Sequence, residues 1–330
     1  MIRSLVVWSC LTLVTCSGGA CQSTETKAAR FSFNWSDWRE SRAFGLGDSL
    51  YLARLQNNTI SLVVIVDGEP QRLMTAKSSL ENGTIPVVTS DRDKALYMVT
   101  TTRGGGPTQV FRYDVASKDF EQYWAGKISG VIIEAHFLPD PNVLIIVTQN
   151  FCYLVDASGS ITDFGPAIHD EAPWYFAASA ASSRALALNL NGGLTVYEPG
   201  EESQIVEQRG RHDSVQEMAS IGDDWIVLHL GSGPDRLLQV GPEKIQKIAA
   251  PPKRYLRVRS YGDVAVLWSH DSSELLFIGS EGTRQVDVNL GEFQEEDLNW
   301  SLLKGYSGHS VFLVDGAGYW TVRIPQLPAP

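Results

Sequence analysis

The sequence predicts an all-β fold in which seven similar units stand in a ring around a central axis. Three observations predict it. Helical periodicity is almost absent after residue 30, short apolar runs recur about every 43 residues, and a second apolar run follows each one after a turn-forming segment. The 330 residues are 43% hydrophobic and 20% charged, which is enough apolar side chain to bury a core. The formal net charge of -11 argues against non-specific nucleic-acid binding, because basic residues drive that binding.

The first residues have the pattern of a secretory signal peptide. Arg3 supplies a positive charge, and residues 5–14 form a mostly apolar run. As a helix, this run would cover about half of a bilayer core, so it is too short to span a membrane. We therefore interpret residues 1–20 as a leader and residues 21–29 as a polar tether, with a buried N-terminal helix as the alternative.

The end of this leader resembles the lipobox of bacterial lipoproteins. Leu13 and Val14 stand where the lipobox has them relative to Cys16, although Thr15 replaces the usual small residue. The resemblance implies cleavage before Cys16 and a lipid on its sulfur, and Ser17 implies the outer membrane. The alternative is Cys21, which follows Ala20 but lacks the leucine. Ordinary cleavage after Ala20 would instead leave a periplasmic or extracellular protein.

The remaining cysteines give no disulfide framework. Cys10 lies in the leader, and Cys152 stands alone in an apolar strand, where we expect a buried and unreactive thiol. Four glycosylation tripeptides keep open a third interpretation, a eukaryotic secreted glycoprotein; they begin at Asn34, Asn57, Asn82 and Asn299.

Two series of apolar runs define the repeat. The first series comprises residues 49–53, 95–100, 143–147, 185–188, 225–228, 264–268 and 311–314. The second comprises residues 61–66, 110–113, 151–155, 194–197, 237–240, 275–278 and 319–323. The linkers within each pair are mostly rich in Gly, Asn, Asp or Ser, which tight hairpin turns require.

This pattern is typical of a β-propeller with seven four-stranded blades, each of which must pack on its neighbours to bury its faces. A β-sandwich is the alternative, but seven strand pairs are too many for one. We expect a single propeller domain over residues 30–324, followed by a proline-rich tail over 325–330. The seventh unit lacks room for a fourth strand. Residues 30–35 alternate apolar and polar, and we expect them to supply that strand and close the ring.

Parts of the repeat resemble the WD40 and PQQ-like propellers. Residues 113–124 and 154–159 are similar to the Asp, turn, Gly and Trp of PQQ-type blades, and residues 268–280 are similar to a WD40 or TolB-like blade. The marks do not recur from blade to blade, so the resemblance indicates the superfamily and no specific member. Outer-membrane assembly lipoproteins are the natural comparison within it, which implies a scaffold role.

No catalytic or metal-binding motif is present in the sequence. The six histidines include no pair with zinc-ligand spacing, and there is no nucleophile elbow or phosphate-binding loop. Asp91 and Asp93 could begin a calcium site, but such a pair is usually a solvated turn. We therefore predict no metal, no cofactor and no catalytic residue; His169 and His212 are the best catalytic candidates if one exists.

Charged and aromatic residues gather in the segments between blades, where propellers commonly bind partners. Trp and Arg are residue types that carry binding energy at interfaces. The alternative is that these loops are polar because they are exposed to solvent, and that a Trp at a blade junction packs between the blades. The candidate ligand or partner face comprises Trp38, Arg39, His169, Asp170, Glu171, Trp174, Arg211, His212, Arg254, Glu295 and Trp300.

These observations favour a non-enzymatic binding or scaffold protein of the bacterial cell envelope, exported and lipid-anchored. Its expected partner is an envelope protein or another macromolecule, with no nucleic acid and with membrane contact through the anchor alone. The alternative is an exported propeller enzyme (a hydrolase, lyase or quinone-dependent oxidoreductase) with its site at the central channel. The sequence leaves the oligomeric state open.

Overall fold

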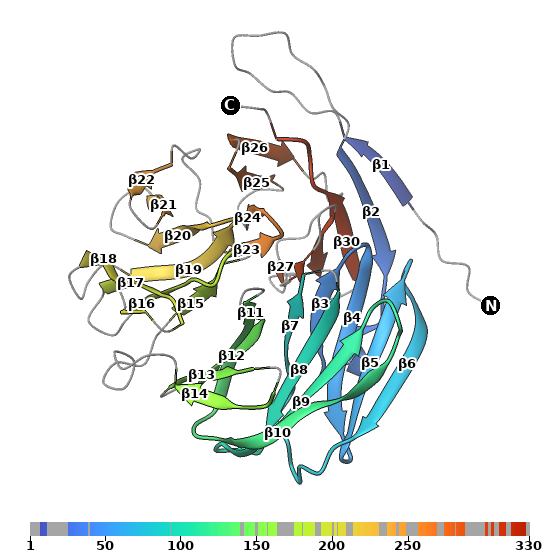
Figure 1. The fold of residues 1–330 in the computed structure, drawn as a ribbon. Helices are drawn as coiled ribbons and strands as arrows, with labels where there is room; N and C mark the ends of the chain where they lie inside the picture. Colours follow the sequence, from blue (N-terminus) through green and yellow to red (C-terminus); the bar gives the residue numbers. More distant parts are fainter. Residues whose placement is uncertain are drawn as a thin grey trace, which may run out of the picture.

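A computed structural model shows the fold of the chain (Figure 1). It describes residues 7–11, 26–38, 40–92, 94–138, 142–148, 151–156, 158–163, 175–179, 181–188, 193–199, 201–202, 204–208, 214–230, 236–241, 244–248, 257–268, 274–280, 282–287, 301–302, 305–306, 310–314 and 318–327. Among these residues, no helix has the length and apolar character to cross a bilayer.

Seven antiparallel sheets stand around a central axis as the blades of a β-propeller, which confirms the predicted fold class (Figure 1). From the axis outward, blade 1 contains β3 (Arg42–Leu46), β4 (Ser49–Gln56), β5 (Thr59–Val66) and β6 (Glu69–Lys77). Blade 2 contains β7 (Val87–Asp91), β8 (Ala95–Thr101), β9 (Gly106–Asp114) and β10 (Phe120–Ile128). Blade 3 contains β11 (Ile132–Leu138), β12 (Val143–Thr148), β13 (Cys152–Val155) and β14 (Ile161–Asp163).

The remaining blades follow the same order. Blade 4 contains β15 (Tyr175–Ala178), β16 (Ala185–Leu188), β17 (Gly193–Tyr197) and β18 (Gln204–Gln208). Blade 5 contains β19 (Ser214–Ile221), β20 (Asp224–Leu230), β21 (Arg236–Val240) and β22 (Ile245–Lys247). Blade 6 contains β23 (Arg257–Tyr261), β24 (Val264–Trp268), β25 (Glu274–Gly279) and β26 (Gly282–Asp287). Blade 7 contains β27 (Ser301–Leu302), β29 (Ser310–Val314), β30 (Gly318–Arg323) and β2 (Thr26–Ser32).

The two predicted series of apolar runs are the two middle strands of each blade. All seven residues of β8 and all six of β12 are buried, because these strands contact a neighbouring blade on each face. The apolar clusters accordingly lie between adjacent blades rather than in one central core. Cys152 lies in one of these clusters, where burial raises its pKa to about 12, so the thiol is unreactive as predicted.

An N-terminal strand closes the ring, as the sequence predicts. Strand β2 pairs antiparallel with β30, and the two appear side by side in Figure 1 as the blue and red strands. The Phe31 ring stacks on Tyr319 with centroids 5.1 Å apart, and the Tyr319 hydroxyl accepts a hydrogen bond of 3.0 Å from the Gly68 amide of blade 1. The stacking packs the closing strand within blade 7, and the hydrogen bond joins the last blade to the first.

The closing strand begins earlier than predicted. It starts at Thr26 rather than at residue 30 and ends at Ser32, so part of the expected polar tether belongs to the sheet. The reason is packing: Ala28 and Ala29 are buried against blade 7. On its other side β2 pairs with β1 (Val7–Leu11), which lies in the expected leader. Removal of the leader would therefore leave β2 as the outer strand of blade 7.

A second seam joins blades 7 and 1 near the axis. Strand β28 (Gly305–Tyr306) leaves blade 7 and pairs parallel with β3 of blade 1. Glycine is required on both strands at this crossing. A Cβ at Gly305 would lie 2.7 Å from the Gly45 carbonyl oxygen, and a Cβ at Gly45 would overlap the Phe312 ring.

We expect Phe31→Ala to lower the free energy of unfolding by about 3–5 kcal/mol, because it removes a buried aromatic ring from the closing strand. Urea unfolding measures the change. Leu73→Ala is the matched control, since Leu73 on β6 is 57% exposed and its loss should cost about 0.5 kcal/mol or less. Equal losses in the two variants would contradict closure by β2.

Candidate functional site: the central channel

Residues from blades 1 to 6, together with Gly305 of β28, line a cavity of about 190 Å³ on the axis. Most of its wall is small or apolar, but charged side chains reach it from four blades: Arg92, Glu134, His136, Glu217 and Arg259. A cavity of this size lies below the range of about 300–1,000 Å³ that is usual for drug-sized ligands. The channel can therefore hold a small molecule or one side chain, but no larger part of a partner.

The two glutamates of the channel follow irregularities in their strands. The pairing of β11 with β12 shifts between Ile132 and Glu134, and that of β19 with β20 shifts between Val215 and Glu217. Such a bulge redirects the side chains that follow it. In both blades it places a carboxylate on the channel wall within a strand that is otherwise mostly apolar.

Glu217 binds the edge of the next blade. Its side chain is 11% exposed, and Oε2 accepts a hydrogen bond of 2.8 Å from the Val258 amide and forms an ion pair with Arg259 Nη1 at 2.7 Å. Oε1 accepts from Arg257 Nη1 at 3.0 Å. Among the described strands, β23 pairs only with β24, so its other edge faces the channel. The carboxylate therefore takes the place of a strand partner for the Val258 amide.

Glu134 and His136 form a second polar pair on β11. The two residues are two apart, so their side chains share one face of the strand, and Oε2 lies 3.1 Å from Nε2. The imidazole also packs beside Phe176 of blade 4, with ring centroids 5.2 Å apart. The His136 side chain is 18% exposed and the Glu134 side chain is 29% exposed, so a ligand in the channel could reach both. An imidazole in contact with a carboxylate is a combination that general acid–base catalysis uses.

Serine hydroxyls connect the inner strands further along the channel. The Ser260 hydroxyl accepts a hydrogen bond of 2.8 Å from the Ser220 amide, and the two hydroxyl oxygens lie 3.2 Å apart. The Ser179 hydroxyl donates to the Gly222 carbonyl at 2.9 Å. Blades 4, 5 and 6 are thus linked by polar contacts at two levels of the channel wall.

Of the eleven residues predicted for the ligand face, Trp38 lies within the described part of the chain. It belongs to the 3-10 helix η1 (Trp35–Trp38), packs against the apolar cluster of blades 6, 7 and 1, and has the Arg54 guanidinium 4.5 Å from its ring centre. This is the packing role that the sequence analysis gave as the alternative. Outside the described residues lie Cys16, Cys21, Arg39, His169, Asp170, Glu171, Trp174, Arg211, His212, Arg254, Glu295 and Trp300.

The channel residues lie inside strands and not in the segments between blades, so the predicted ligand face does not include them. The signal available was the occurrence of charged residues inside short, largely apolar strands, as in the segments Ile132–Leu138 and Ser214–Ile221. A charge inside a buried strand needs a partner, so these residues would have stood out.

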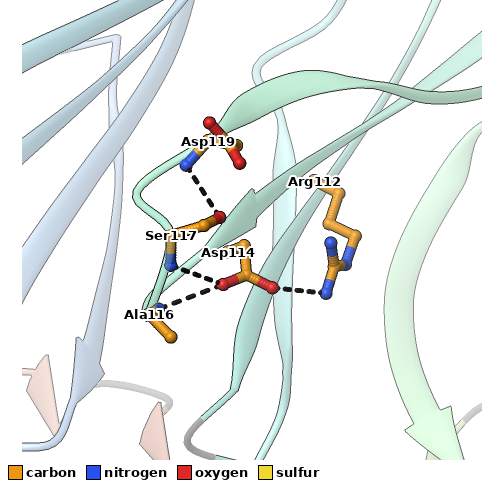
Figure 2. Close-up of polar contacts among 5 residues, drawn as sticks. All are labelled: Arg112, Asp114, Ala116, Ser117 and Asp119. Atoms are coloured by element: carbon orange, nitrogen blue, oxygen red, sulfur yellow. Dashed lines mark hydrogen bonds and ion pairs between the residues drawn. The ribbon is translucent and has the colours of Figure 1, made fainter.

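The motif that resembles PQQ-type blades has a structural role here. Asp114 Oδ1 accepts hydrogen bonds from the amides of Ala116 and Ser117 at 3.0 and 2.9 Å, and Oδ2 accepts from Arg112 Nη2 at 2.7 Å (Figure 2). The Asp119 amide donates a further hydrogen bond to the Ser117 hydroxyl in the same turn (Figure 2). The Ser117 amide, with help from Arg112, lowers the pKa of Asp114. The carboxylate thus holds the turn between β9 and β10.

The tryptophan of the same motif joins two blades. Trp124 Nε1 on β10 donates a hydrogen bond of 3.0 Å to the Gly159 carbonyl in the turn after β13. Gly159 has a φ of 82°, and a Cβ there would lie 3.1 Å from the indole. The resemblance to PQQ-type blades therefore reflects how blades 2 and 3 dock. Asp93 of the possible calcium pair lies outside the described residues, among which no group of three metal-ligating side chains occurs.

Solved structures similar to this one are also propellers. Virginiamycin B lyase from Staphylococcus aureus has a TM-score of 0.57 and 10% identity, and the match covers 91% of this chain and 100% of the lyase. Oligogalacturonate lyase from Vibrio parahaemolyticus has a TM-score of 0.54 and 11% identity, covering 98% and 99% of the two chains. The β-propeller domain of the trilobed protease from Pyrococcus furiosus has a TM-score of 0.55 and 10% identity, covering 88% and 99%. At these identities the likeness shows the fold alone.

No family model matches the sequence, and no curated protein is significantly similar to it.

We expect Glu217→Gln to lower the free energy of unfolding by about 2 kcal/mol, because Arg259 would lose its charged partner in a poorly solvated place. Arg257→Gln is the control: the Arg257 side chain is 47% exposed, and such an exposed ion pair contributes about 1 kcal/mol or less. Urea unfolding compares the two. An equal loss in both would show that burial of Glu217 contributes nothing beyond a surface ion pair.

Proposed function

We propose that this protein is an exported, lipid-anchored binding or scaffold propeller of the bacterial cell envelope, with its ligand site at the central channel. The leader and the lipobox-like segment support export and anchoring. The observation that carries the binding role is the polar wall of the channel, where Glu134, His136, Glu217 and Arg259 come together from three blades. Burial of several charged groups at one place on the axis supports a recognition site, since each is costly unless it is paired or contacts a ligand.

The charged groups favour binding over catalysis. Glu217 is held by two hydrogen-bond donors at 2.8 and 3.0 Å and by an ion pair with Arg259 at 2.7 Å, so it is a fixed part of the wall rather than a base poised for proton transfer. The partner would contact the rim of the channel and insert one small group. This arrangement suits an envelope protein or another macromolecule that docks on one face of the ring.

An exported enzyme is the second candidate, and one observation favours it. The contact of 3.1 Å between His136 and Glu134 supplies an imidazole and a carboxylate within hydrogen-bond reach at the channel. Two structurally similar proteins are named as lyases. An elimination that begins with removal of a proton needs a base. His136 would be that group in this chain.

The anchor is tested by the intact mass of the protein from the membrane fraction of a bacterial expression host. We expect a protein cleaved before Cys16 that carries a diacylglyceryl group, and Cys16→Ser should abolish the adduct and release the protein from the membrane. Cys21→Ser is the matched control and should leave the adduct in place. Loss of the adduct in the Cys21→Ser variant alone would move the site to Cys21, and an uncleaved or unmodified chain would refute the anchor.

Binding and catalysis are separated by capture from a solubilised envelope fraction. A binding propeller should retain its partner with unchanged mass, and Glu134→Lys should reduce the retained amount at least tenfold because it reverses a charge on the channel wall. Leu73→Ser on the outer strand β6 is the control and should retain the partner. Release of a chemically altered product that His136→Gln abolishes would instead establish the enzyme.

A further inference from the structure

The outer edge of blade 7 is covered by a strand that removal of the leader would take away. Strand β1 pairs antiparallel with β2 without a register shift, from Val7 opposite Arg30 to Leu11 opposite Thr26 (Figure 1). The pairing of β2 with β30 on its other side is equally regular. Cleavage in the predicted leader would therefore leave the backbone N–H and C=O groups along this edge of β2 without strand partners.

The outer strands of most other blades carry features that oppose pairing with a further strand. A bulge places an extra residue in three of them, namely Gln71 in β6, Tyr123 in β10 and Val206 in β18. Strand β6 also contains Pro70, which has no N–H to donate. Strands β14 and β22 are three residues long, so they offer little edge to a partner.

Of the described outer strands, β2 and β26 remain as regular edges of useful length. On β26, Arg284 donates a hydrogen bond to the Gln326 carbonyl, so the C-terminal tail already contacts this strand. The seven residues of β2 include no proline and no bulge. A regular edge without such protection is the kind to which a partner adds a strand.

The side chains of β2 indicate which kind of segment would bind there. Lys27 and Arg30 are the charged residues of the strand, and Arg30 is exposed and lies 5.5 Å from the centre of the Trp320 ring. In the pairing with β1, Val7 stands opposite Arg30 and Cys10 opposite Lys27, so the leader offers no carboxylate at either position. A segment with acidic residues at these two positions would gain two favourable cross-strand pairs.

We propose that the outer edge of β2 binds an extended acidic segment of an envelope protein, which adds as an antiparallel strand to blade 7 after the leader is removed. A second copy of this chain fits less well, because two β2 edges would bring four positive charges together. Cys16 and Thr26 are ten residues apart, so the edge lies within about 35 Å of the proposed anchor. The inference goes beyond the channel site and rests on the proposed function for the removal of the leader.

Fluorescence polarisation with labelled peptides tests the inference on the chain without residues 1–20 and on the full chain. The acidic probe is a peptide of residues 5–13 with Val7→Glu and Cys10→Glu, and the basic probe carries Val7→Lys and Cys10→Lys. We expect the acidic probe to bind the shortened chain about tenfold more tightly, because opposite charges on paired strands attract and like charges repel. The full chain should bind it more weakly, since β1 occupies the same edge.

Two controls address the backbone and the folding of the shortened chain. Ser9→Pro in the acidic probe should abolish binding, because proline disrupts a strand at its centre. Urea unfolding checks that the shortened chain is folded. Ser9→Pro in the full chain weakens the β1 pairing and should raise its affinity for the acidic probe, which keeps the test valid if the shortened chain does not fold.

Charge reversal on the protein supplies the matched variants. Lys27→Glu combined with Arg30→Glu should invert the preference, so that the basic probe binds more tightly than the acidic one. Lys77→Glu reverses an exposed charge on the bulged outer strand β6 and should leave the preference unchanged. Lys27→Glu alone should reduce the preference, and it covers the case in which the loss of Arg30 from the Trp320 ring disturbs the fold.

Equal binding of the acidic and basic probes, full binding of the proline probe, or equal effects of the β2 and β6 variants would overturn the inference. Dimerisation of the shortened chain that the acidic probe cannot displace would assign the edge to a second copy instead. Because the peptides are tested without a membrane, their failure to bind leaves export and anchoring standing. Conversely, an unmodified chain in the membrane fraction would refute the anchor without changing the affinity of the β2 edge.

Discussion

The structure depends on one constraint, which is that neither face of a blade can remain in water. The middle strands are buried on both faces, as the uninterrupted burial of β8 and β12 shows. Each apolar cluster is therefore completed by side chains from the next blade, and an unclosed ring would leave two such faces wet. Closure by β2 on the outside and by β28 near the axis follows from this requirement, because each joins the last blade to the first.

The same packing leaves a different problem at the axis. Except for β3, which pairs with β28, each described inner strand has an edge that no other described strand covers, and its amides need partners. Between blades 5 and 6 the chain solves this with side chains, namely the Glu217 carboxylate on the Val258 amide and the Ser260 hydroxyl on the Ser220 amide. The fold therefore requires polar groups near the axis whether or not a ligand binds there.

The polar side chains that pair with strand edges at the axis connect stability with function in the channel. Glu217 and Arg259 hold adjacent blades together, and both residues line the same cavity. Similar propellers named as lyases share the fold at 10% or 11% identity, so this architecture tolerates extensive change in sequence. Two of the side chains that line this channel, Glu217 and Arg259, also stabilise the contact between blades 5 and 6.

The sequence by itself determined the seven units, the two middle strands of each blade and the strand that closes the ring, because these follow from local apolar periodicity and turn residues. It also indicated the Asp114 turn, whose partners lie within five residues. Only the tertiary structure decided which charges meet in the channel. Glu217 and Arg259 are far apart in the sequence, and bulges in β11 and β19 set the direction of the glutamates. Contacts between blades depend on the closed ring, so no local pattern in the sequence encodes them.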